Sequence, residues 1–166
     1  EHPMPRLPLI LATALTLAPL PALASDWVAG IGAADFSHSG SPTEPNLTVE
    51  YHAAPTWHPG HWSIGLGGAL ELDRAGDAWA GAGIAARYDF SQAWFIEMSE
   101  MPGLYHGAKT TTDLGGPIEF RTLFGVGYRF DNGYGISLAI DHRSNANLYS
   151  PNPGVNKVSL RLTHNF

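Results

Sequence analysis

Segments of strictly alternating apolar and polar residues make up most of this chain, and they restrict its fold more than any other feature. In the segment 61–72, Trp62 and Ile64 share one parity, whereas Ser63 and Gly65 share the other. A period of two places successive side chains on opposite faces of a β-strand. No segment shows the 3.6-residue period of an amphipathic helix. The sequence therefore predicts an all-β protein.

Clusters of Gly, Pro, Asn, Asp and Ser divide the alternating region into eight segments, each close to the roughly 9 to 11 residues that a tilted membrane strand requires. The predicted strands span 27–36, 46–53, 61–72, 78–88, 93–101, 118–130, 134–143 and 157–166. The longer connections alternate with short turns such as Asp131-Asn132-Gly133, as in barrels whose short turns are periplasmic. We expect an eight-stranded antiparallel transmembrane β-barrel of the bacterial outer membrane.

The alternation alone does not say which face points outward. A lipocalin-like soluble barrel would place its apolar side chains inside, the reverse of a membrane barrel. The terminal Phe166 follows an amphipathic strand and resembles the assembly signal of bacterial outer-membrane proteins. This favours the apolar face as the outer one, although His164 interrupts the pattern.

The first 24 residues have the layout of a secretory signal. Arg6 precedes an apolar run over 7–18, and the segment ends in Ala22-Leu23-Ala24. A run of about a dozen apolar residues is too short for a transmembrane helix. We expect residues 1–24 to be a signal peptide and residues 25–166 to be one barrel domain.

Composition removes several classes of function. The chain has no cysteine, so disulfides and metal–thiolate sites are excluded. Its net charge is −6 and its basic residues are scattered, so a nucleic-acid surface is not expected. His52, His58 and His61 raise the alternative of a metal site, but His52 has lumen parity and the other two lie at a turn. We expect no metal and no cofactor.

The remaining charged residues of the strands share the parity predicted for the lumen. An eight-stranded barrel is just wide enough to be filled by side chains. We expect a structural charge network formed by Glu71, Glu97, Glu119, Arg121, Arg129 and Arg161. Aromatic residues near the periplasmic strand ends are expected to form an interfacial girdle, namely Trp57, Trp62, Trp94, Tyr88 and Phe90.

His142 and Ser144 have the outward parity of the seventh strand, at its outer end. Polar residues are unfavourable on a lipid-facing surface unless they lie near an interface. Side chains two residues apart on a strand emerge about 6 to 7 Å apart, so an imidazole nitrogen can reach a hydroxyl. The pair is therefore a candidate nucleophile and base. The alternative is a polar pair at the interface without a chemical role.

The surrounding sequence resembles one family. His142-Arg143-Ser144-Asn145-Ala146, followed by Leu148, Pro151-Asn152 and Gly154, is similar to the C-terminal segment of the lipid A 3-O-deacylase (PagL) family. Phe95-Ile96-Glu97 and 125–130 with the Asn132-Gly133 turn also resemble that family. The resemblance is clear over about the last 75 residues.

The resemblance implies a serine esterase that removes an ester-linked 3-hydroxyacyl chain from the 3 position of lipid A in lipopolysaccharide. Ser144 would be its nucleophile and His142 its general base. Asn145, Asn152 and the backbone amides around 147–152 would donate hydrogen bonds to the oxyanion.

Asn156 departs from the family pattern, in which a Glu is the third member of the catalytic triad. An Asn can orient a histidine through its carbonyl oxygen, but with its amide reversed it would favour the wrong imidazole tautomer. With Asn156 at this position, the sequence is compatible with an enzyme of intact activity, of reduced activity or of no activity.

Two rival functions remain. One is a non-enzymatic small barrel with a role in adhesion or membrane stability. The other is a lipid A palmitoyl transferase, whose barrel holds an acyl chain in its lumen; the charged lumen predicted here argues against it. The expected partners are lipid A and the membrane, and both a monomer and a homodimer are left open.

Overall fold

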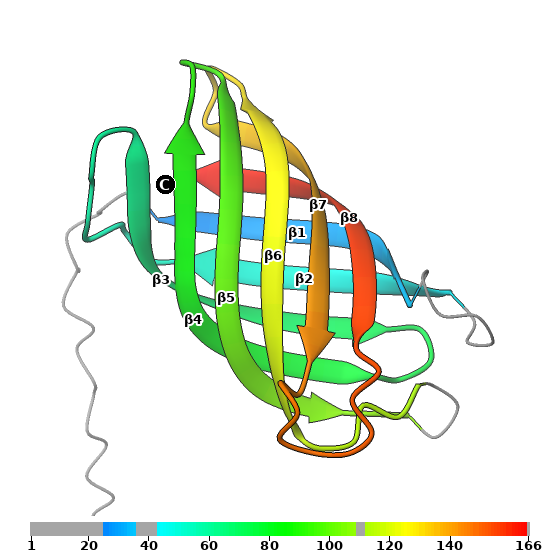
Figure 1. Ribbon diagram of the computed structural model, residues 1–166. Coiled ribbons are helices and arrows are strands. Elements are labelled where there is room, and N and C mark those ends of the chain that lie inside the picture. The colour runs from blue at the N-terminus through cyan, green and yellow to red at the C-terminus, as the bar shows by residue number, and fades with distance from the viewer. Residues whose placement is uncertain (1–24, 36–42, 109–111, 166) are drawn as a thin grey trace, which may run out of the picture.

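Eight antiparallel strands close into one barrel in the computed structural model, which describes residues 25–35, 43–108 and 112–165 (Figure 1). The strands are β1 (Asp26–Ala34), β2 (Glu44–His52), β3 (Trp62–Asp73), β4 (Ala78–Asp89), β5 (Trp94–His106), β6 (Ile118–Arg129), β7 (Tyr134–Ser144) and β8 (Val155–Asn165). Each pairs with its neighbours in sequence, and β1 pairs with β8 to close the sheet. The predicted fold class is confirmed. The expectations for residues 1–24 and for Phe166 lie outside the described residues.

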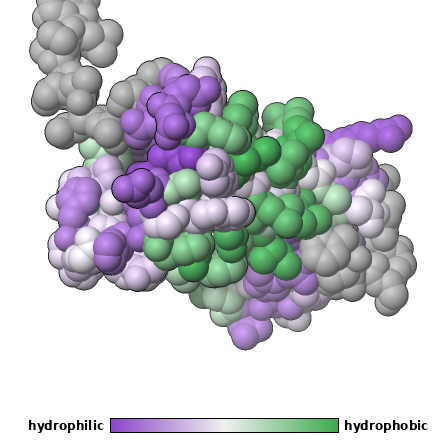
Figure 2. All heavy atoms as spheres, turned by 90° about the horizontal axis from the view of Figure 1, so that it is seen from above, coloured by the Kyte–Doolittle hydropathy of each residue, from purple (hydrophilic) through white to green (hydrophobic). Residues whose placement is uncertain are grey.

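The outer face of the barrel is apolar and the inner face is polar. Large apolar side chains alternate outward along the strands, among them Leu66 at 66% exposure and Leu138 at 61%. Figure 2 shows hydrophobic side chains gathered across the middle of one face, with hydrophilic ones toward the ends. This is the arrangement of a lipid-embedded barrel and the reverse of a lipocalin. The described part of the chain contains no helix long and apolar enough to cross a membrane.

Buried ion pairs fill the lumen. Glu50 lies between two guanidinium groups, with Arg161 Nη1 2.7 Å from its Oε1 and Arg121 also bonded to that oxygen. A second cluster surrounds Glu71, which contacts Arg121 at 3.1 Å and also Lys157. Each of these side chains is at most 2% exposed. Opposite charges at such distances offset part of the free-energy cost of burying them.

Most of the predicted lumen charges take part in this network. Glu97 contacts Arg161 at 3.0 Å, and Arg129 contacts Asp89 at 2.7 Å near the end that holds the termini. Glu119 is buried on the lumen side as expected, but its carboxylate accepts no hydrogen bond from the described residues. These ion pairs make the middle of the lumen a packed, charged core.

The fifth strand runs beyond the predicted end at residue 101, to His106. The prediction left Pro102 and Gly103 in the connection after the strand, yet the strand continues to pair with β6 through Pro102↔Phe120 and Leu104↔Ile118. The reason lies in the tertiary structure: a Cβ on Gly103 would stand 2.5 Å from the buried indole of Trp79. Because Gly103 has no side chain, it leaves room for the Trp79 ring, and β5 continues as a strand past residue 101.

Candidate active site

The outer end of β7 carries the two candidate catalytic side chains. His142 is exposed and Ser144 is half-buried, and both point outward from the barrel. In the register, His142 lies opposite Thr122 of β6 and opposite Asn156 of β8. The Ser144 hydroxyl does not hydrogen-bond to the imidazole in the described structure. Such bonds are often long in unliganded enzymes and shorten when substrate binds.

Asn156 binds the imidazole directly. Its Oδ1 lies 2.8 Å from Nδ1 of His142. A carbonyl oxygen can only accept, so Nδ1 carries the proton and donates it to this bond. Nε2 is then left unprotonated, as a general base for a neighbouring hydroxyl must be. Of the two orientations that the sequence leaves open for the Asn156 amide, this is the one that favours the productive tautomer.

Gly154 forms the other side of the histidine site, a feature not predicted from the sequence. This buried residue has φ = +68°, a left-handed conformation that residues with a Cβ adopt at a cost in free energy. A Cβ there would lie 2.6 Å from Cε1 of His142 and 3.1 Å from its Nε2. The backbone of Gly154 is therefore packed directly against the imidazole ring.

The loop after Ser144 is held by two asparagines. The Asn145 side chain is fully buried, and its Nδ2 donates to the carbonyls of Leu114 at 2.6 Å and Pro151 at 3.0 Å. The backbone N–H of Asn145 donates to Oδ1 of Asn152 at 3.0 Å. The Asn152 amide thus lies beside the peptide unit that follows Ser144. Both hydrogens of the Asn145 side-chain amide are therefore used in these two bonds, one to the Leu114 carbonyl and one to the Pro151 carbonyl.

A small apolar cluster lies at this end of the barrel. Leu114 is 1% exposed and packs with Ala34 and Val155. Its carbonyl is the one that Asn145 binds, so the connection after β5 is joined to the loop between β7 and β8 (Figure 1). The candidate site itself faces the outside of the barrel wall.

Two further polar residues face outward beside His142. Thr122 of β6 lies opposite it, and Thr122 in turn lies opposite Glu100 of β5. The Thr122 hydroxyl donates to Oε2 of Glu100 at 2.5 Å. Sequence reasoning missed both residues, although the parity of β5 was sufficient to show a carboxylate among the outward side chains Trp94, Ile96 and Met98.

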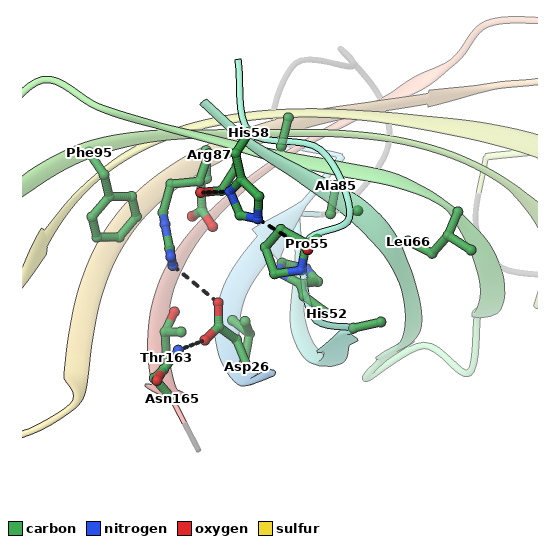
Figure 3. Close-up of a pocket in the computed structure, with 16 residues that line it drawn as sticks. Asp26, His52, Pro55, His58, Leu66, Ala85, Arg87, Phe95, Thr163 and Asn165 are labelled. Atoms are coloured by element: carbon green, nitrogen blue, oxygen red, sulfur yellow. Dashed lines mark hydrogen bonds and ion pairs between the residues drawn. The ribbon is translucent and has the colours of Figure 1, made fainter. Parts of the chain in front are cut away.

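A separate cavity of about 170 Å³ lies at the opposite end of the barrel, lined by residues of β1 to β5, of β8 and of the connection between β2 and β3 (Figure 3). The three histidines considered for a metal lie at this end, and each has a different neighbour. His52 contacts Glu50 at 3.0 Å, His58 contacts the Pro55 carbonyl at 3.2 Å, and the His61 ring packs edge-on against Tyr88. Among the described residues, no group of three or more possible ligands is arranged to hold a metal.

Comparison of the sequence with known proteins shows its family. Residues 43–165 match the family model described as lipid A 3-O-deacylase (PagL). A curated relative, lipid A deacylase PagL of Pseudomonas aeruginosa, is 29% identical over 163 residues, covering 88% of this chain and 94% of the relative.

Solved structures agree on the fold. The crystal structure of the outer membrane enzyme PagL superimposes with a TM-score of 0.69 at 21% identity, covering 84% of this chain and 98% of the other. Neisserial surface protein A superimposes with a TM-score of 0.54 at 13% identity, covering 86% and 96%.

Proposed function

This chain belongs to the lipid A 3-O-deacylase (PagL) family, and on that premise we propose that Ser144, His142 and Asn156 together form its catalytic unit. The protein is an outer-membrane β-barrel enzyme, a carboxylic ester hydrolase that acts on lipid A. The observation that carries the proposed assignment is the 2.8 Å bond between Asn156 Oδ1 and His142 Nδ1. It leaves Nε2 unprotonated on the same outward face as the Ser144 hydroxyl.

The reaction follows from these positions. Ser144 Oγ attacks the ester carbonyl carbon of the acyl chain while His142 Nε2 accepts the hydroxyl proton. The resulting imidazolium gives that proton to the sugar oxygen that leaves, and an acyl-enzyme remains. A water molecule then attacks the acyl-enzyme, with His142 again as the base. The products are a free fatty acid and the deacylated lipid.

The oxyanion donors belong to the loop over 145–152. Because the Asn145 amide is committed to the Leu114 and Pro151 carbonyls, we assign it the role of holding this loop in place. Asn152 accepts the backbone N–H of Asn145 at its Oδ1, and its Nδ2 donates to Oδ1 of Asn147 at 3.0 Å. We assign the second hydrogen of this amide, beside the peptide unit after the nucleophile, as a donor to the developing oxyanion. The backbone amides of the loop complete the proposed set.

Substrate reaches this site laterally. Buried ion pairs pack the middle of the lumen, and Leu114 packs with Ala34 and Val155 at its outer end, whereas His142 and Ser144 face outward. The ester of a lipid standing beside the barrel is presented to that outward face. Every residue of the proposed site comes from one chain, so the site is complete without a second copy.

The test compares purified wild-type protein with Ser144→Ala and His142→Ala, using lipid A in mixed micelles and mass spectrometry of the products. Each variant should lose nearly all activity, and the double variant should be little worse, because residues that act as one unit are non-additive. Heat-modifiable mobility on gels reports whether each variant folds. A folded Ser144→Ala protein that still releases fatty acid would refute the assignment of the nucleophile.

A further inference from the structure

Glu100 is the one Asp, Glu, Lys or Arg that faces outward from the described strands. The other charged residues of these strands have lumen parity, as the buried network shows. On β5 the outward parity is shared by Trp94, Ile96, Met98, Glu100, Pro102, Leu104 and His106, and Glu100 is exposed. A carboxylate on a lipid-facing surface is unfavourable unless it lies near the interface. The position of the Glu100 carboxylate on this face therefore indicates a chemical role.

The register gives Glu100 a specific place. It pairs with Thr122, Thr122 pairs with His142, and His142 pairs with Asn156. The four residues thus form one row across β5, β6, β7 and β8 on the outer face. Neighbouring strands are about 4.8 Å apart, so Glu100 and His142 are separated by roughly 10 Å. The Thr122 hydroxyl between them holds the carboxylate by a hydrogen bond.

The chemistry of His142 provides the reason. When its Nε2 takes the Ser144 proton, the ring becomes a cation, and Asn156 on β8 offers only a neutral carbonyl oxygen at Nδ1. The outward face of the described strands contains one negative charge, and it lies in the same row on the other side of the ring. We propose that Glu100, held by Thr122, is a positioning residue that supplies the negative charge stabilising the His142 imidazolium. This inference rests on the proposed function.

The expected size of the effect follows from the separation. At roughly 10 Å and an effective dielectric constant of about 20, the attraction between unit charges corresponds to roughly a tenfold change in rate. The attraction exists only after proton transfer, when the ring is charged. An interaction present in the transition state and absent from the ground state changes kcat and leaves KM unchanged.

The experiment uses Glu100→Gln, which keeps the length of the side chain and an oxygen for Thr122 but removes the charge. In the lipid A micelle assay its kcat should fall roughly tenfold with KM unchanged, whereas Glu100→Asp should keep most of the activity. The same change is then made in an Asn156→Glu background, where β8 carries a charge next to the ring. There Glu100→Gln should have a clearly smaller effect, because the two carboxylates serve the same cation.

Full activity of Glu100→Gln would overturn the inference, and so would a rise in KM at constant kcat, which would instead indicate a contact with substrate. An equal loss in both backgrounds would also overturn it. The proposed function fails separately: an active Ser144→Ala variant refutes the nucleophile whatever Glu100 does. An inactive Ser144→Ala together with a fully active Glu100→Gln refutes only the role of Glu100.

Discussion

Replacing Gly154 by alanine tests how closely the barrel holds its histidine. The new Cβ would lie 2.6 Å from Cε1 of His142, whereas non-bonded carbons are usually about 3.5 to 4.0 Å apart. The imidazole must therefore move by about 1 Å. It can do so because a side chain gives way more easily than backbone, so the strands stay paired. A displacement of about 1 Å in a catalytic group lowers activity by roughly 100-fold.

Gly60 provides the matched control for this change. Its φ is +64°, close to the +68° of Gly154, but a Cβ there would meet nothing within 4 Å. Both alanine variants carry the penalty of a left-handed residue, roughly 1 to 2 kcal/mol. They should lose similar stability, measured by the temperature at which heat-modifiable mobility is lost. Only the Gly154 variant should lose activity in the micelle assay.

The result that would refute this reasoning is a folded Gly154→Ala protein with wild-type kcat. It would mean that the imidazole does not need the position seen against residue 154. Equal losses of activity in the Gly154 and Gly60 variants would also refute it, since backbone strain alone would then explain both.

Other predictions concern the orienting residue, the lumen and the N-terminal segment. Asn156→Ala should lower kcat more than tenfold, since an unoriented base loses much of the 10²- to 10⁴-fold contribution of general base catalysis; unchanged rates would place the orienting group elsewhere. Asn156→Glu should raise kcat about fivefold, because charge-assisted hydrogen bonds are stronger by about 1 kcal/mol; a fall would count against a charge deficit at the ring. Glu50→Gln should destabilise the barrel by roughly 3 to 5 kcal/mol in urea titrations, since it leaves buried guanidinium groups without their partner, and an unchanged midpoint would contradict that role. N-terminal sequencing of the protein from outer membranes should begin at Ser25, and a retained segment 1–24 would show that it is not a cleaved signal.

The barrel could be predicted from the sequence because every strand must alternate between apolar residues that face the lipid and polar residues that face the lumen. A shift of one residue would turn the charged lumen toward lipid, so strand positions follow directly from parity. Apart from the end of β5, the predicted boundaries differ from the observed ones by at most two residues. The C-terminal end of β5 depends on the contact between Gly103 and the Trp79 ring. Trp79 lies far from Gly103 in sequence, so no local sequence pattern predicts this contact.

The candidate site could also be predicted in part from the alternation of residues along the strands. Parity placed His142 and Ser144 together on the outer face, and the order of the strands placed Asn156 beside them. Glu100 and Thr122 become neighbours of the histidine only when the register of β5, β6 and β7 is known. Gly154 belongs to the motif that carries the family resemblance, but its role could not be found without coordinates, because that role is the space it leaves for the His142 ring.

The outward position of Ser144 on the barrel wall has a consequence for the kinetics of this enzyme. On the proposed lateral route, substrates arrive and products leave within the plane of one leaflet. The relevant concentration is then a surface density, and turnover depends on exchange among the lipids that surround the barrel. Because the site occupies one side of the wall, rotation of the barrel about the membrane normal decides which neighbouring lipid meets it next.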